Sequence, residues 1–291
     1  MSKVFEALQR AEKEQGTGLT GPAVEKVPEA PVEEADLAGL ETLVSFAAST
    51  EESKPSEARL SPLIIVHWQP ESLIVEQIKR IRTHILHYSK TPSPPRTIMV
   101  TSALSGEGKS LLAANVAVTI AQGLTETVLL VDSDMRNPTL HEYFGRPQNP
   151  GLSDYLATAL ELDDVIQETQ IPRLNFIAGG SRKKNPIELI SSERMAGLIS
   201  HVREEDGNRF IVFDTTPIAL TNEPRILAKV VDGVILVVRQ GVTNRNAVKE
   251  AISFLEKDKI IGMVLNGSSL DSLGVYGKYG KYGRYGSRVK P

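Results

Sequence analysis

Six short, mainly apolar runs alternate with stretches of helical pattern between residues 96 and 268, and this alternation limits the fold more than any other feature. The runs are Ile98–Thr101, Val128–Val131, Leu174–Ile177, Phe210–Phe213, Val234–Val238 and Ile260–Leu265. The helical stretches include 109–122, 186–203 and 244–256. Strands that are apolar along their length are buried on both faces, which is typical of a parallel sheet covered by helices. The order therefore predicts an α/β fold with a mainly parallel sheet flanked by helices on both faces.

The first run is followed by a loop with the spacing of a phosphate-binding P-loop. Residues 103–110 read Ala-Leu-Ser-Gly-Glu-Gly-Lys-Ser, which fits G-x-x-x-x-G-K-[ST] with alanine at the first glycine. Backbone N–H groups of such a loop surround a phosphate, and the N-terminus of the following helix adds its dipole. We therefore expect a nucleotide site lined by Ser105, Gly106, Glu107, Gly108, Lys109 and Ser110. Lys109 is placed to reach the β- and γ-phosphates.

Two later runs end in carboxylates. Asp132 closes one run and Asp134 lies two residues on, while Asp214 closes the run Phe210–Phe213. Ligands of parallel α/β sheets bind at the carboxyl ends of the strands, so these side chains are expected to face the phosphates. The predicted cofactors are ATP and Mg²⁺, with Ser110, Asp134 and Asp214 as metal ligands. The predicted catalytic residues are Lys109, Asp132, Asp134 and Asp214.

Together these motifs resemble those of the bacterial P-loop tyrosine kinases (BY-kinases). The run Asp132–Arg136 is similar to the Asp-x-Asp-x-Arg motif of that family, called Walker A′, and Phe210–Asp214 has the Walker B form. The resemblance covers about residues 71–291 and implies a P-loop NTPase fold of the MinD/ParA-like branch. The departures from the family pattern are Ala103, Ser105, Thr216 and Lys79. None of them removes a charged ligand of the metal or phosphate.

A predicted helix before the first run carries a second likeness to the family. Four isoleucines form a helical stripe between Pro70 and Pro92, namely Ile74, Ile78, Ile81 and Ile85. On the same segment, Glu76, Lys79 and Arg82 are similar to the family's E-x-x-R-x-x-R oligomerisation motif, with Lys79 in place of arginine. The resemblance implies a homo-oligomer, with a ring as the expected form.

The resemblance also implies an activity and a cellular setting. The activity is ATP-dependent protein-tyrosine autophosphorylation, linked to the regulation of capsule or exopolysaccharide biosynthesis and export. Asp132 is predicted to accept the proton of the tyrosine. Arg136 is placed among the cofactor-binding residues and is expected to organise the acceptor side or a subunit contact. The implied partners are protein substrates and a membrane-embedded polysaccharide co-polymerase that activates the kinase. We expect a cytoplasmic protein that reaches the membrane through this partner.

The last residues supply candidate acceptors. Four tyrosines recur every third residue in the tail: Tyr276, Tyr279, Tyr282 and Tyr285. Glycine also recurs every third residue from Gly274, which disfavours a helix and predicts a flexible segment over 269–291. The tail carries five Lys and Arg and no acid after Asp271, so it is suited to a site lined by carboxylates. Considered without the other motifs, such a segment is equally typical of a low-complexity tail without a role or of a Tyr/Gly-rich tail that stacks on RNA.

The rest of the chain divides by composition. Residues 1–15 predict an amphipathic helix, 16–60 an acidic disordered linker, 61–268 the kinase domain and 269–291 the flexible tail. A net charge of −3 gives no whole-chain signal for nucleic acid. The absence of cysteine excludes disulfides and thiolate metal sites.

Two other functions remain as alternatives. One is a non-kinase ATPase of the ParA/MinD type, and the other is a non-catalytic regulator of polysaccharide export. ParA/MinD proteins carry a signature lysine where this chain has Leu104, and the glycine-rich tail cannot form the amphipathic C-terminal helix of MinD. Only an activity assay separates the non-catalytic regulator from the kinase.

Overall fold

A computed structural model describes residues 60–205 and 208–268 of the chain. All of them belong to the unit Ser56–Pro291, one of two units into which the chain divides. The predicted N-terminal helix (1–15), almost all of the predicted linker and the tail tyrosines lie outside the described residues. The first described residue, Leu60, is buried in the core.

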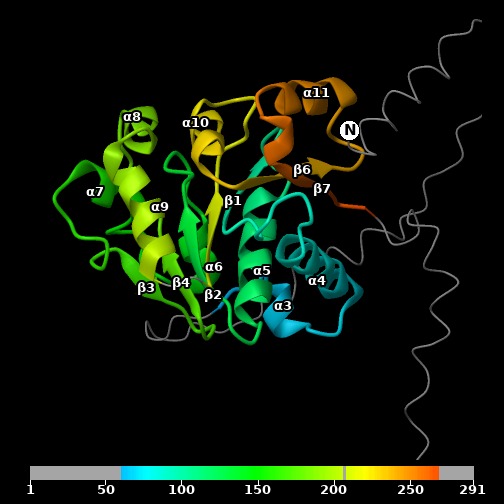
Figure 1. Ribbon diagram of the computed structural model, residues 1–291, viewed down its shortest axis with the longest axis horizontal. Coiled ribbons are helices and arrows are strands. Elements are labelled where there is room, and N and C mark those ends of the chain that lie inside the picture. The colour runs from blue at the N-terminus through cyan, green and yellow to red at the C-terminus, as the bar shows by residue number, and fades with distance from the viewer. Residues whose placement is uncertain (1–59, 206–207, 269–291) are drawn as a thin grey trace, which may run out of the picture. The chain divides into compact units, whose positions relative to one another are not determined.

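A seven-stranded sheet of order β3-β4-β2-β5-β1-β6-β7 forms the centre of the unit (Figure 1). The six predicted strands are β1 (Thr97–Ser102), β2 (Thr127–Asp132), β4 (Leu174–Ile177), β5 (Arg209–Asp214), β6 (Gly233–Arg239) and β7 (Ile260–Asn266), and all pair in parallel. The seventh, β3 (Ile166–Glu168), is an antiparallel edge strand that the sequence did not reveal. This strand has only three residues, two of which are the polar Gln167 and Glu168, so it shows no apolar pattern that would predict a strand.

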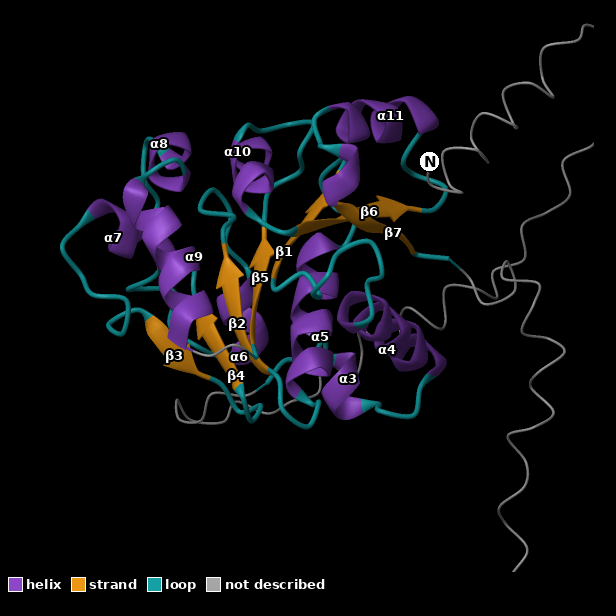
Figure 2. Cartoon of the chain, viewed as in Figure 1, coloured by secondary structure: helices purple, strands orange, loops and turns teal. Residues whose placement is uncertain are grey.

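Helices cover both faces of this sheet, as expected (Figure 2). One apolar core lies under α3 (Ile65–Trp68), α4 (Leu73–Leu86), α5 (Lys109–Ala121) and α6 (Leu140–Phe144). The other lies under α7 (Leu152–Ala157), α8 (Pro186–Ile190), α9 (Glu193–Glu205), α10 (Glu223–Val230) and α11 (Arg245–Ser253). The predicted α/β class with a mainly parallel sheet is therefore confirmed. No described helix is both long and apolar enough to cross a bilayer.

Two helical predictions needed correction. The stretch 186–203 forms two helices rather than one, because the Ser192 hydroxyl donates to the Leu189 carbonyl and accepts from the Met195 N–H, which ends α8 and begins α9. In α4, Ile74 is 56% exposed and Val75 is fully buried in its place. The buried face of α4 thus begins one residue later than the isoleucine stripe indicated.

Candidate active site at the carboxyl edge of the sheet

The loop between β1 and α5 has the backbone shape that its glycines require. Gly106 and Gly108 have φ values of 76° and 88°, in the left-handed region that favours glycine. A Cβ on Gly106 would meet no atom within 4 Å, whereas a Cβ on Gly108 would lie 2.1 Å from Nδ2 of Asn266. Gly108 is therefore needed both for the turn and for the close approach of β7.

The Glu107 side chain braces this loop from behind. Its carboxylate accepts hydrogen bonds from the backbone N–H of Leu104 at 2.7 Å and from the Thr243 hydroxyl, and Glu107 is 1% exposed. Arg239 adds a bond from its guanidinium to the Gly106 carbonyl at 3.0 Å. Of the predicted phosphate-binding residues, Glu107 therefore offers only its backbone N–H.

Asn266 holds the same loop from the end of β7. Its Nδ2 donates to the Glu107 carbonyl at 2.8 Å. In the structure its amide fixes the loop backbone.

Lys109 lies between the two carboxylates predicted to flank it. Its Nζ is 3.4 Å from Asp134 Oδ2 and 3.9 Å from Asp214 Oδ1, and it donates to the Ser110 hydroxyl at 3.1 Å. Burial lowers the pKa of Lys109, but the surrounding carboxylates raise it more, so the pKa lies above its ordinary value. Lys109 is thus a fixed positive charge at the centre of the site.

Asp214, at the end of β5, is fully buried, and neither of its oxygens has a hydrogen-bond partner among the described residues. Burial raises the pKa of this carboxyl to about 6, against the opposing effects of Lys109 and of the nearby Ser110 hydroxyl and Thr215 N–H. A buried carboxylate with open lone pairs is costly unless a cation satisfies it. Asp214 therefore fits a divalent metal as well as it fits Lys109.

Asp132, at the end of β2, is fixed more firmly. Its Oδ2 accepts the N–H groups of Thr139 and Leu140, both at 3.0 Å, and its Oδ1 accepts that of Asp134 at 3.2 Å. Burial, reinforced by the charge of Asp214, raises its pKa well above the ordinary value. Asp132 therefore shapes the loop after β2 and is a stronger base than a solvated carboxylate.

The donor set suits Mg²⁺. Within residues 60–205 and 208–268, no group of three or more His, Cys, Asp or Glu side chains is placed to hold a metal. Magnesium is usually bound by one or two carboxylates, and its other ligands are waters and phosphate oxygens. Ser110, Asp134 and Asp214 supply a hydroxyl and two carboxylates of this kind. The structure therefore brings the predicted metal ligands together around Lys109.

Arg136 pairs with a residue outside this cluster. Its Nη2 and Nε both lie 2.7 Å from Oε1 of Glu223, which is 4% exposed at the start of α10. The sequence motifs did not identify Glu223 as part of the site. Its only signal was an acid before Pro224, the pattern of a helix start.

The residues predicted to mediate oligomerisation, all on α4, have partners within the chain. Glu76 pairs with Lys79 at 2.7 Å on the exposed face of the helix. Arg82 reaches Glu126 in the α5–β2 connection at 3.7 Å. Glu76 and Lys79 are about half exposed, so they remain available to a second copy.

The chain is similar in sequence and in fold to known proteins. CapB of Staphylococcus aureus is 36% identical to the chain over 222 residues, which span 76% of the chain and 95% of CapB. The tyrosine-protein kinase YwqD of Bacillus subtilis is 34% identical over 221 residues, which span 75% of the chain and 92% of YwqD. Among solved structures, the chimerical protein CapA2B2 matches with a TM-score of 0.65 and 32% identity, over 77% of this chain and 97% of that one. No protein-family model matches the chain.

Proposed function

The chain belongs to the bacterial P-loop tyrosine kinases, and from that premise we propose that it transfers the γ-phosphoryl group of ATP to its own tail tyrosines within an oligomer. The observation that carries the proposal is the position of Lys109. Its amino group lies 3.4 Å from Asp134 and 3.9 Å from Asp214, beside a glycine loop shaped for phosphate. The acceptors are Tyr276, Tyr279, Tyr282 and Tyr285.

Each residue of the site has a proposed task. Mg²⁺, when bound, neutralises charge on the β- and γ-phosphates. Ser110, Asp134 and Asp214 hold the ion, and the backbone N–H groups of residues 105–110 bind the phosphates. Lys109 stabilises the charge that spreads over the transferred group, in a site where burial strengthens electrostatic interactions.

Asp132 is proposed to receive the proton of the acceptor phenol. A phenol with a pKa near 10 needs a nearby base to become a good nucleophile. The raised pKa of Asp132 makes it a stronger base than an ordinary aspartate. Its three backbone hydrogen bonds leave lone pairs available, because a carboxylate has about four acceptor positions.

Membership of this family also supports a role in the cell. We propose that the kinase regulates capsule or exopolysaccharide biosynthesis and that a membrane-embedded co-polymerase activates it and brings it to the membrane. Self-association is proposed to use Glu76, Lys79 and Arg82. The exposed Glu76–Lys79 pair supports this, since it can exchange partners with little loss.

Incubation of the purified full chain with Mg-ATP, followed by mass analysis of the tail, tests the proposal. We expect phosphate on the tail tyrosines of the wild type. Lys109→Met should lower the rate by orders of magnitude, because charge stabilisation dominates phosphoryl transfer. If the wild type gains no phosphate, or gains it on serine alone, even with the activator's cytoplasmic segment present, the kinase assignment fails.

A further inference from the structure

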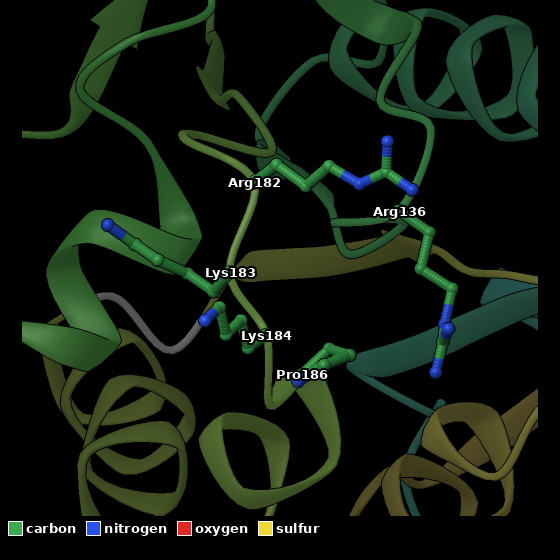
Figure 3. A pocket seen from close by; sticks show the side chains of 5 residues that line it. All are labelled: Arg136, Arg182, Lys183, Lys184 and Pro186. Carbon is green, nitrogen blue, oxygen red and sulfur yellow. The ribbon is translucent and has the colours of Figure 1, made fainter.

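A cationic cavity of about 380 Å³ lies beside the site and has no task in the proposed reaction. It is lined by Pro186 and four basic residues: Arg136, Arg182, Lys183 and Lys184 (Figure 3). No acidic residue lines it. Figure 3 shows Arg136 and Arg182 on the same side of the cavity, projecting from different segments of the chain.

The cavity adjoins the carboxylates of the site. Arg136 follows Asp134 by two residues, so their Cα atoms lie within about 7 Å. The loop that carries the other three cations packs against the loop after β2, since a Cβ on Gly179 would lie 2.5 Å from Cβ of Pro138 and 3.7 Å from Cγ of Asp132. A group bound in the cavity is therefore close to the phosphoryl-transfer centre.

Internal contacts hold this loop in place. Asp154 accepts the N–H of Ser181 at 3.0 Å and pairs with Lys183 Nζ at 2.9 Å. Burial opposes ionisation of Asp154, but these donors outweigh it and its pKa is lowered. Gln148 adds a hydrogen bond from its side chain to the Gly180 carbonyl at 3.0 Å. The cations are thus presented by a braced segment.

Two of the four cations remain free for a ligand. Glu223 occupies one side of Arg136, and Asp154 occupies Lys183. Arg182 and Lys184 are exposed, and neither forms an ion pair with any residue in the described parts of the chain. Arg136 itself keeps half of its side chain exposed. Together with the two free cations, the exposed half of Arg136 therefore gives the cavity three positively charged side chains that can bind one anion.

The tail can supply that anion only after modification. The unmodified tail has five basic residues and no acid after Asp271, so the cavity repels it. A phosphotyrosine adds about −1.5 to −2 charges and three acceptor oxygens, which suit the fork of an arginine. Successive tail tyrosines are three residues apart, or about 10 Å in an extended chain. A step of this length can span the roughly 7 Å between the Cα atoms of Arg136 in the cavity and Asp134 in the site.

We propose that the cationic cavity, defined by Arg136, Arg182, Lys183 and Lys184, binds a phosphotyrosine of the tail and so presents the neighbouring tyrosine for transfer. The inference rests on the proposed function, because it requires a first phosphotyrosine. It predicts that phosphorylation of the tail speeds up after the first event and spreads to adjacent tyrosines. The phosphate that each transfer adds to a tyrosine is then bound by the cationic cavity in the next transfer.

Direct peptide binding without ATP tests the cavity. The probes are three peptides of residues 274–287: unmodified, phosphorylated at Tyr282, and carrying Tyr282→Glu. The protein is the full chain with Lys109→Met, so that its own tail stays unmodified. We expect the phosphorylated peptide to bind at least about tenfold more tightly than the unmodified peptide, because its phosphate forms charge-assisted hydrogen bonds. The glutamate peptide should fall close to the unmodified one.

A pair of variants locates the effect. Arg182→Ala/Lys184→Ala should remove the preference for the phosphorylated peptide. Lys90→Ala/Lys229→Ala is the matched control, because it removes two exposed lysines near the opposite, amino ends of the strands and should preserve the preference. Circular dichroism checks that both double variants keep the fold.

Transfer to the peptides separates this inference from the function on which it rests. With the active chain and Mg-ATP, we expect faster modification of Tyr279 and Tyr285 in the phosphorylated peptide. Transfer at equal rates to both peptides, with equal binding, overturns the inference and leaves the kinase intact. Glutamate binding as tight as phosphotyrosine also overturns it. Absence of transfer to any tyrosine, tail or peptide, overturns the proposed function itself.

Discussion

At the scale of single residues, the site has two special features: a glycine at a position where a side chain would clash, and a buried carboxylate whose oxygens accept no hydrogen bond among the described residues. The glycine loop approaches β7 so closely that Asn266 touches the position a Gly108 side chain would take. Asp214 is that carboxylate: no residue in the described part of the chain forms a hydrogen bond with it, although Lys109 lies 3.9 Å away. Both features lower the stability of the ligand-free protein, and we expect them to serve the binding of a ligand.

The two loop glycines should differ in their tolerance of alanine. Gly106→Ala should cost about 1–2 kcal/mol, the strain of a left-handed residue, because no atom lies near its Cβ. Gly108→Ala should cost more, because the new Cβ also meets Asn266 at 2.1 Å. Denaturant unfolding of both variants and of Gly108→Ala/Asn266→Ala measures the difference. If Asn266→Ala restores none of the lost stability, the contact is not the cause.

Because the pKa of the buried Asp214 carboxyl is raised, its charge should lower the stability of the fold in a pH-dependent way. Its pKa is raised to about 6 in the folded protein, above the ordinary value of 3.8, so its charge destabilises the fold above pH 6 and no longer does so below pH 4. Asp214→Asn should therefore stabilise the metal-free protein at pH 8 by up to about 3 kcal/mol, and by much less at pH 4.5. It should also abolish phosphorylation.

Urea unfolding at the two pH values, without nucleotide or Mg²⁺, measures this effect. Lys109 keeps Asp134 as a partner in the variant, 3.4 Å away, so loss of its ion pair with Asp214 is partly compensated. A gain in stability that is equal at both pH values would show that the charge of Asp214 is not responsible.

At the scale of elements, α4 combines a structural face with an exposed charged face. Val75, Ile78 and Ile85 are buried in the apolar core that α4 shares with α5. On the other side, Glu76 and Lys79 pair with each other in the way that i,i+3 residues of any helix can. The geometry of one copy is therefore satisfied by intrahelical pairing, and only the assembly tests the oligomerisation motif.

Replacement of Glu76, Lys79 and Arg82 by alanine should dissociate the oligomer while the fold persists. The loss of stability should be about 1 kcal/mol, because the two ion pairs are exposed or partly exposed. Light scattering measures the mass. The matched control replaces Arg245, Lys249 and Glu250 on the exposed face of α11, which changes the charge equally. An unchanged mass for the first variant, or equal losses for both, contradicts a specific interface.

At the scale of the whole molecule, the tail and the site have to meet. Asp271, the last acid, lies five residues before Tyr276, and β7 ends at Asn266. Ten residues of flexible chain span about 17 Å on average and at most about 34 Å. Reach therefore permits transfer within one copy, and the family's oligomerisation motif favours transfer between copies.

Mixing two variants separates these routes. Lys109→Met protein with an intact tail is combined with active protein truncated after Ser272. We expect phosphate on the inactive partner, read by intact-mass analysis, because only transfer between copies can place it there. An unmodified partner in mixed oligomers of demonstrated composition would establish transfer within one copy.

The sequence alone was sufficient for the fold class and for the central cluster. Strands that are apolar along their length and alternate with helices indicate a parallel sheet covered on both faces. Such a sheet brings the residues that follow its strands together at one edge. Lys109, Ser110, Asp132, Asp134 and Asp214 come together for that reason. Local pattern failed where a contact distant in sequence decides the outcome, as with the short strand β3, which exists because it pairs with β4.

Only the tertiary structure decided how the supporting residues act. Glu107 looks like a phosphate-loop residue in sequence, yet its side chain is buried against Thr243 and the Leu104 N–H. Arg136 belongs to a nucleotide motif, yet it pairs with Glu223, 87 residues away. The cationic cavity is lined by Arg136 and by residues of the loop after β4, which lie far apart in the sequence. The direction of a side chain and its ion pairs depend on neighbours that folding brings together, and the spacing of residues in the sequence does not predict those neighbours.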